Sequence, residues 1–334
     1  MGEELSLHPY PHNQGDKTMT TIQPLLPEDA PAMAAMRQAA SAHKGEPMGP
    51  DARPMFDAMF AATPAAANVR VEPATVGGIA GFWLRLPHPR PGARVLYIHG
   101  GGYVLGSAQA LTNFAGQIAA RVGADTFVPD YRLAPEHPFP AAVDDAVAAY
   151  RGLVAEGAER IAVVGDSAGG GLTLALLSIL AADKANGMMQ PVGAAAMSPW
   201  TDLALTGDSF ETRAAADPIF TRGVLQAFAE MYLQGQDTTN PKASPLYAQL
   251  GGVPPIRIDV GDDELLLADS IRYADRARAA GVEITLSVWE GMPHVFQSSL
   301  GQFLAAEQSV NAISDFLRRR LIDFSPSIST PSEV

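Results

Sequence analysis

Short apolar runs alternate with helix-length segments from about residue 65 of the chain onward. Residues 95–98 and 161–164 contain no charged position, which is typical of strands buried on both faces of a parallel sheet. The glycines within residues 74–78 predict a hairpin between the first two strands. The predicted strands span residues 68–73, 79–86, 94–99, 126–129, 160–164, 192–197, 256–260 and 283–289. The predicted helices span residues 109–121, 141–155, 168–184, 265–280 and 302–321.

This alternation predicts an α/β fold in which eight mostly parallel strands form one sheet flanked by helices. Two regions do not follow it: residues 27–60, which are helical in pattern, and residues 201–248, which are inserted after the sixth predicted strand. An insertion at the carboxyl edge of a parallel sheet is well placed to cover a pocket. We therefore expect these two regions to form one helical cap.

The resulting organisation has a catalytic domain in two pieces. The polar first residues and the Ser- and Pro-rich last residues predict disordered tails. The predicted parts are a tail at 1–18, the first part of the cap at 19–64, the catalytic domain at 65–200 and 249–322, the inserted part of the cap at 201–248, and a tail at 323–334.

Composition narrows the chemistry and the partners. The 334 residues are 47% hydrophobic and include no cysteine, which excludes disulfides, Cys-ligated metals and thiol nucleophiles. The net charge of −13 disfavours nucleic acid as a partner. No run reaches the ~20 apolar residues of a membrane span, and no secretory signal opens the chain, so we expect a cytoplasmic protein.

The strongest motif is Gly165-Asp166-Ser167-Ala168-Gly169, directly between a predicted strand and a predicted helix. In that context G-x-S-x-G is the sharp turn that presents a nucleophilic serine at a helix N-terminus. The alternative is a structural turn rich in glycine. The flanking strand and helix favour Ser167 as the nucleophile.

A nucleophilic serine needs a base, and the chain has seven histidines. In enzymes with this motif, the acid and then the histidine follow the serine along the chain. His294 follows the last predicted strand and is the one histidine beyond Ser167, so we predict that it is the base. The other six precede Ser167: His8, His12, His43, His88, His99 and His137.

The acid is expected between them, at the end of the strand over residues 256–260. Asp262, Asp263 and Glu264 follow that strand directly. One of the three must orient the imidazole and stabilise its cation. Spacing alone does not choose among them.

A second glycine motif, His99-Gly100-Gly101-Gly102, directly follows the third predicted strand. Backbone amides there can stabilise the oxyanion of acyl transfer, together with the amide of Ala168. The alternative is a phosphate-binding loop, but neither G-x-G-x-x-G nor the P-loop pattern is present. No metal-binding motif occurs either, so we expect no metal and no cofactor.

Six segments together form a specific combination: HGGGYVLG (99–106), DYRLAPEHPFPAAVDD (130–145), GDSAGG (165–170), SPWTDL (198–203), VGDDELLLADS (260–270) and GMPHVF (291–296). On these segments the chain resembles the bacterial hormone-sensitive-lipase family of α/β-hydrolases. The resemblance implies the α/β-hydrolase fold with a helical cap. It covers about residues 65–320.

The resemblance also implies roles for single residues. It selects Asp263 as the acid and Gly100, Gly101 and Ala168 as the oxyanion donors. The family often continues from its acid as D-P-L, whereas this chain has Asp263-Glu264-Leu265.

Several residues are expected to support these groups. His99 and Gly102 would shape the oxyanion loop, and Asp166 would brace the turn at the nucleophile. Glu136 would form a buried polar network with Arg132. A direct role for Glu136 at the substrate is the alternative.

The implied activity is a serine carboxylesterase that hydrolyses small esters with short to medium acyl chains through an acyl-enzyme. Tyr103, Phe220 and Val295 are expected to line the substrate pocket. A lactone hydrolase with the same triad is an alternative, because residues 217–221 and 198–203 are similar to those of relatives that open lactones. Peptide or amide cleavage is a further variant.

A non-catalytic small-molecule receptor of the same fold is an alternative of a different class. Receptors of this kind lack the catalytic histidine, and His294 is present, so the sequence favours an enzyme. A homodimer that pairs the edge strand at residues 283–289 is also expected.

Overall fold

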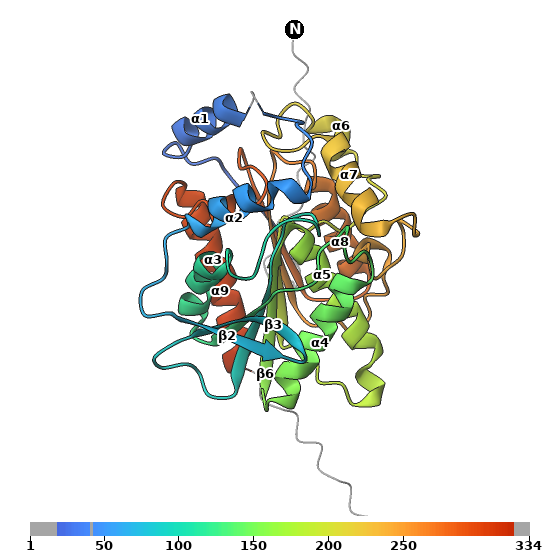
Figure 1. Ribbon diagram of the computed structural model, residues 1–334. Coiled ribbons are helices and arrows are strands. Elements are labelled where there is room, and N and C mark those ends of the chain that lie inside the picture. The colour runs from blue at the N-terminus through green and yellow to red at the C-terminus, as the bar shows by residue number, and fades with distance from the viewer. Residues whose placement is uncertain (1–18, 41–42, 324–334) are drawn as a thin grey trace, which may run out of the picture.

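The computed structural model describes residues 19–40 and 43–323 (Figure 1). The predicted tail at residues 1–18 lies outside this part, and so does the predicted tail at residues 323–334 except for Asp323, which ends a helix. The described chain forms one sheet of nine strands in the order β1-β9-β8-β7-β6-β4-β5-β3-β2. The strands are β1 Met19–Gln23, β2 Arg70–Val76, β3 Ile79–Arg85, β4 Ala93–Ile98, β5 Asp125–Pro129, β6 Arg160–Asp166, β7 Gly193–Met197, β8 Ile256–Gly261 and β9 Ile284–Trp289.

The sheet is mostly parallel, as the apolar runs predicted. Strands β2 and β3 form the predicted hairpin, and only the β2–β3 and β3–β5 pairs are antiparallel. Along β6, Ile161 and Val163 pack on one face, while Ala162 and Val164 pack on the other. Both faces exclude water along this stretch, so residues 161–164 are all apolar.

Helices cover both faces of the sheet. Helices α3 and α9 pack together on one face, and α4, α5 and α8 cover the other (Figure 1). These helices are α3 Thr112–Val122, α4 Ala141–Ala155, α5 Ser167–Ala182, α8 Leu267–Ala279 and α9 Leu304–Asp323. This three-layer arrangement confirms the predicted α/β-hydrolase architecture.

Helices α1, α2, α6 and α7 lie at one end of the sheet (Figure 1). From the N-terminal part come α1 Ala30–Ala40, η1 Pro50–Ala52 and α2 Arg53–Ala61. From the insertion between β7 and β8 come α6 Ser209–Thr212, α7 Arg222–Leu233 and η3 Pro245–Tyr247. The short helices η2 Lys184–Asn186 and η4 Phe296–Ser298 complete the described elements.

Strand β1 departs from the prediction. Residues 19–23, assigned to the cap from the sequence, extend the sheet by pairing in parallel with β9, from Met19 opposite Thr285 to Gln23 opposite Trp289. Polar positions dominate this strand and none is fully buried, so it lacks the apolar run by which the other strands were recognised. Because β1 pairs with β9, β9 is not an edge strand. The edge of β9 that was expected to pair with a second copy of the chain is already paired with β1.

Within residues 19–40 and 43–323, no helix is both long enough and apolar enough to cross a membrane.

Candidate active site

Ser167 is the first residue of α5 and directly follows β6. Its φ of 52° is a strained value for a residue other than glycine, and such values persist where the surroundings fix them. A Cβ on Gly165 would lie 2.4 Å from the Gly169 carbonyl oxygen, and one on Gly169 would lie 2.1 Å from that of Ile98. Glycine at both positions therefore lets β6, α5 and β4 meet closely enough to form this turn.

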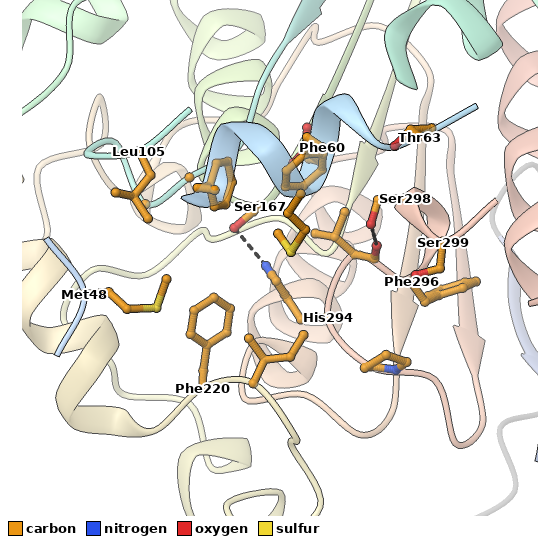
Figure 2. A pocket seen from close by; sticks show the side chains of 18 of the residues that line it. Met48, Phe60, Thr63, Leu105, Ser167, Phe220, His294, Phe296, Ser298 and Ser299 are labelled. Carbon is orange, nitrogen blue, oxygen red and sulfur yellow. Dashed lines mark hydrogen bonds between the residues drawn. The ribbon is translucent and has the colours of Figure 1, made fainter. Parts of the chain in front are cut away.

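His294 lies in the loop after β9, and its Nε2 is 2.8 Å from Ser167 Oγ (Figure 2). Each residue is only 8% exposed. The Phe220 ring packs edge-on against the imidazole with 5.1 Å between the ring centroids. The pair has the spacing needed for a neutral imidazole to take the serine proton.

Glu264 is the carboxylate that contacts His294. Its Oε1 lies 3.2 Å from His294 Nδ1. Its Oε2 accepts hydrogen bonds from Ser198 Oγ at 2.7 Å and from the Gly261 amide at 3.2 Å. The side chain is fully buried, so these contacts hold the carboxylate in one orientation beside the imidazole.

The prediction of Asp263 as the partner of His294 is therefore wrong. The Asp263 side chain points to α1, where it forms an ion pair with Arg37, and its amide donates to the Met292 carbonyl. Asp262 accepts a hydrogen bond from the Gly291 amide at 2.6 Å. Consecutive side chains leave the turn after β8 in different directions, so the family-based assignment is displaced by one residue.

The charges around His294 favour its protonated form. Burial alone would lower the pKa of His294, but the carboxylates of Glu264, Asp217 and Asp166 together outweigh it, so the pKa lies above its ordinary value. Burial raises the pKa of Asp166 to about 6, against the hydrogen bonds from Tyr97 and Gly100. The site thus stabilises an imidazolium that forms during a reaction.

The glycine loop after β4 presents backbone amides to the same cavity. Gly101 and Gly102 line it beside Ser167, with φ values of 111° and 61°. In the described chain neither amide nitrogen has a hydrogen-bond partner. The Ala168 amide lies in the first turn of α5, where amides lack an intrahelical acceptor.

The Gly100 amide is not available as an oxyanion donor. It donates to Asp166 Oδ2 at 3.1 Å, and Asp166 Oδ1 accepts from Tyr97 Oη at 2.6 Å. The prediction for Gly100 is therefore corrected: its amide holds the loop to the serine turn, whereas Gly101 and Gly102 line the cavity beside Ser167. Asp166 braces the turn as the sequence predicted.

His99 shapes this loop as expected. Its Nδ1 is 2.8 Å from the Gly100 carbonyl oxygen, and its ring stacks on Tyr131 with 4.3 Å between centroids. Burial lowers the pKa of His99. Because its ring is fully buried and contacts the loop and Tyr131, it is a structural residue of the loop.

Glu136 has a different partner from the predicted one. Arg132 pairs with Asp145, at 2.6 Å, whereas Glu136 pairs with Arg53 of α2, at 2.7 Å. The Glu136 side chain is 52% exposed, so the expected buried Arg132–Glu136 network does not form. Asp145 binds the Arg132 guanidinium through both Nε and Nη2, and Glu136 binds Arg53 instead.

A cavity of about 420 Å³ opens at Ser167 and His294. The N-terminal helices, the insertion between β7 and β8 and the loops at the sheet's carboxyl edge contribute to it, and its walls are mainly apolar. The apolar lining includes Met36, Met48, Met55, Phe56, Met59, Phe60, Leu105, Trp200, Phe220, Leu225, Phe228 and Val295. Figure 2 shows Met48 and Leu105 on one side of the Ser167–His294 pair, and Thr63, Ser298 and Ser299 on the opposite side.

Phe220 and Val295 lie in the lining, as the sequence predicted. Tyr103 does not, and that prediction is wrong. Its side chain is 1% exposed and stacks on Tyr232 of α7 with 3.9 Å between ring centroids. The backbone at Tyr103 has a φ of 64°, so its side chain leaves the turn toward the core rather than toward the cavity.

Comparison with known proteins places this geometry in a family. A model described as the alpha/beta hydrolase fold matches residues 95–298. An acetyl-hydrolase of Streptomyces hygroscopicus is 38% identical over 256 residues, which cover 75% of this chain and 84% of that protein. The structure of an esterase/lipase from an uncultured bacterium has 40% identity and a TM-score of 0.82, covering 89% of this chain and all of that one.

A second solved structure, an esterase from the bacterial hormone-sensitive lipase (HSL) family, is 38% identical with a TM-score of 0.81. The match covers 89% of this chain and 99% of that esterase. The chain belongs to the HSL family of α/β-hydrolases. The resemblance seen in the six sequence segments is thereby confirmed, and so is the enzyme class: this HSL-family protein is a carboxylic ester hydrolase.

Sequence reasoning missed two residues that organise this HSL-family site. Ser198, directly after β7, donates to Glu264 and accepts from the Val295 amide at 3.1 Å. Asp217 of the insertion accepts hydrogen bonds from the amides of Phe220, at 2.8 Å, and Leu265, also at 2.8 Å. The sequence did offer a signal for both: Ser198 begins the SPWTDL segment, and Asp217 is followed by a proline.

Among the residues that the structure describes, no cluster of three or more His, Asp or Glu side chains has an arrangement suited to a metal ion.

Proposed function

We propose that this protein is a serine carboxylesterase in which Ser167, His294 and Glu264 form the catalytic triad. The observation that carries the proposal is the chain of contacts from Ser167 Oγ to His294 Nε2, at 2.8 Å, and from His294 Nδ1 to Glu264, at 3.2 Å. A buried carboxylate on Nδ1 holds the ring with Nε2 free to accept a proton. The substrates are small, uncharged esters with short to medium acyl chains.

In the first half of the reaction, Ser167 Oγ attacks the ester carbonyl carbon while its proton passes to His294 Nε2. The carbonyl oxygen becomes an oxyanion and accepts hydrogen bonds from the amides of Gly101, Gly102 and Ala168. The bond from carbon to the alcohol oxygen then breaks. His294 gives its proton to that oxygen, so the alcohol leaves neutral and the acyl group stays on Ser167.

In the second half, water takes the place of the alcohol. His294 accepts a proton from the water as its oxygen attacks the acyl carbon, and the same amides bind the new oxyanion. The bond to Ser167 Oγ breaks with return of the proton from His294. The products are a carboxylic acid and the free enzyme, and Glu264 stays ionised throughout.

The lining of the cavity supports the substrate class. Aromatic and methionine side chains provide contacts that adapt to an acyl chain without offering a partner for a charge. A volume of about 420 Å³ is at the lower end of the range for small-molecule sites, roughly 300–1,000 Å³. These features favour short and medium chains over long ones.

The direct test is hydrolysis of 4-nitrophenyl esters from acetate to laurate by the wild type and by Ser167→Ala. We expect the highest kcat/KM at short to medium chain length and nearly complete loss of turnover in the variant. A variant that hydrolyses these esters like the wild type would remove Ser167 from the mechanism. A lactone panel run in parallel separates the alternative: lactones turned over faster than every ester would replace the ester assignment.

A further inference from the structure

The turn that carries the proposed oxyanion donors has an unusual backbone. Gly101, Gly102 and Tyr103 all have positive φ, at 111°, 61° and 64°. From inside, the turn is closed by hydrogen bonds from the amides of Val104 and Leu105 to the Gly101 carbonyl, at 3.0 and 2.8 Å. Positive φ is costly at a tyrosine, so contacts from outside the turn must help to hold it.

Arg53, the first residue of α2, supplies such contacts. Its Nε donates to the Val104 carbonyl at 2.8 Å, and its Nη2 donates to the Ala134 carbonyl at 2.9 Å. The Ala134 amide in turn donates to the Tyr103 carbonyl at 2.9 Å. Val104 and Ala134 are fully buried, where a carbonyl without a donor would be destabilising.

Glu136 holds the guanidinium in place. Its two carboxylate oxygens accept from Arg53 Nη1 at 2.9 Å and from Nη2 at 2.7 Å, a bidentate pair. The hydrogen bond from Arg53 lowers the pKa of Glu136 to about 2, so the pair stays ionised across the whole neutral range. Only the planar fork of arginine matches a carboxylate and two carbonyls at once.

We propose that Arg53 is a positioning residue of the oxyanion hole, which holds the 101–105 turn so that the amides of Gly101 and Gly102 face the carbonyl oxygen at Ser167. This inference rests on the proposed function for its effect on catalysis. It assigns to α2 a second task besides lining the pocket. A further contact of α2 with the same loop, from Ser107 Oγ to Asp57 Oδ2 at 2.9 Å, acts in the same direction.

The expected effect on the kinetics follows from the stage of the reaction at which the amides of Gly101 and Gly102 bind most strongly. They bind the oxyanion much more strongly than the ground-state carbonyl, so a displaced turn weakens the transition state more than it weakens substrate binding. Loss of Arg53 is therefore expected to lower kcat with little change in KM. A residue that only stabilised the fold would change the melting temperature and leave kcat of the folded enzyme intact.

The test compares Arg53→Met, Arg53→Lys and Glu136→Gln with the wild type, and uses Arg70→Met as a control. Arg70 lies on β2 and its side chain is 75% exposed, so its removal should leave kcat unchanged. For Arg53→Met we expect kcat to fall about 10- to 100-fold with KM within about 3-fold, less than the complete loss of an oxyanion donor. Arg53→Lys should fall between Arg53→Met and the wild type, because it keeps the charge but not the fork. Glu136→Gln should have a smaller effect than Arg53→Met.

A trifluoromethyl ketone with a short alkyl chain provides a second readout, because its adduct with Ser167 carries the oxyanion. Its inhibition constant should rise in Arg53→Met by the factor by which kcat/KM falls. Hydrogen exchange provides a third: the peptide over residues 100–106 should exchange faster in Arg53→Met, while the peptide over residues 160–170 should not.

The outcomes separate the two proposals. If kcat, the inhibition constant and the exchange at residues 100–106 all stay at wild-type values in folded Arg53→Met, the positioning role is refuted while the esterase remains. If the wild type lacks turnover that depends on Ser167, the proposed function fails, and exchange at residues 100–106 still decides whether Arg53 holds the turn. Should Arg53→Met not fold, Arg53→Lys decides: wild-type kcat in this variant overturns the proposal.

Discussion

The two halves of the active site are held by different kinds of contact. The half with Ser167 and the glycine loop is fixed by its backbone, because a Cβ on Gly169 or Gly100 would collide with neighbouring atoms at 2.1 and 2.3 Å. The half with His294 and Glu264 is fixed by side chains, which meet from the loops after β9 and β8 and are joined by Ser198. The first half permits only glycine at its close contacts, whereas the second permits different side chains to compete for one place.

This difference explains where the sequence was informative. A steric requirement at one position leaves a visible residue, so the glycines pointed directly to Ser167 and to the loop at residues 99–102. The position of a carboxylate depends on partners far away in the chain. Three adjacent acidic residues look alike in sequence, although Glu264 alone finds Ser198 and the Gly261 amide.

The largest expected effect is in the backbone-fixed half. Ser167→Ala should lower kcat/KM for 4-nitrophenyl butyrate by about 10³-fold or more, because both covalent steps need the hydroxyl. Ser178→Ala in the same helix is the matched control and should keep wild-type turnover. Circular dichroism of both variants checks the fold, and substantial turnover by folded Ser167→Ala would contradict the account.

The next effect is on folding of the same half. Gly169→Ala should lower the free energy of unfolding by about 3 kcal/mol, because its Cβ would overlap the Ile98 carbonyl oxygen, and overpacking typically costs ~1–3 kcal/mol. Gly251→Ala, where no atom lies within 4 Å of the added Cβ, should change it by less than about 0.5 kcal/mol. Urea denaturation measures both, and equal stabilities would show that the close contact does not define the turn.

The pH profile examines the side-chain half. His294 acts as a base when neutral, and its pKa lies above the ordinary value, so kcat/KM should rise with pH through a midpoint above about 6.5. In Glu264→Gln the carboxylate that raises this pKa is removed while burial remains, so the midpoint of the residual activity should move to lower pH. A midpoint that is the same in both proteins would separate Glu264 from His294.

The smallest expected effect concerns the ion pair between α1 and Asp263. The Arg37 side chain is 46% exposed, and exposed pairs contribute about 0–1 kcal/mol. Arg37→Met should therefore lower the free energy of unfolding by about 1 kcal/mol or less and change kcat by less than about 3-fold. A loss of kcat as large as that of Glu264→Gln would mean that Asp263 and α1 take part in the chemistry.

Much of the fold could be predicted, because buried strands leave apolar runs and all eight predicted strands are present. Strand β1 could not, since its side chains are exposed or half-buried and its pairing with β9 is a backbone interaction. Tyr103 was misplaced for a related reason: its position next to the glycine loop suggested the cavity, but the positive φ there turns the ring to Tyr232. In the candidate site, Ser167 and His294 could be found by motif and elimination. The choice of the acid and the loss of the Gly100 amide as an oxyanion donor depended on contacts made only in the folded chain.

The central claim, that Glu264 and not Asp263 orients His294, is tested most directly by kcat/KM of Glu264→Gln and Asp263→Asn measured side by side. The amide in Glu264→Gln keeps the shape but cannot stabilise the imidazolium, so we predict a loss of about 10²- to 10⁴-fold. Asp263→Asn should retain kcat/KM within about 3-fold, since its carboxylate pairs with Arg37 and the carboxylate that contacts the imidazole is that of Glu264. The reverse ranking, with Asp263→Asn crippled and Glu264→Gln active, would contradict the account.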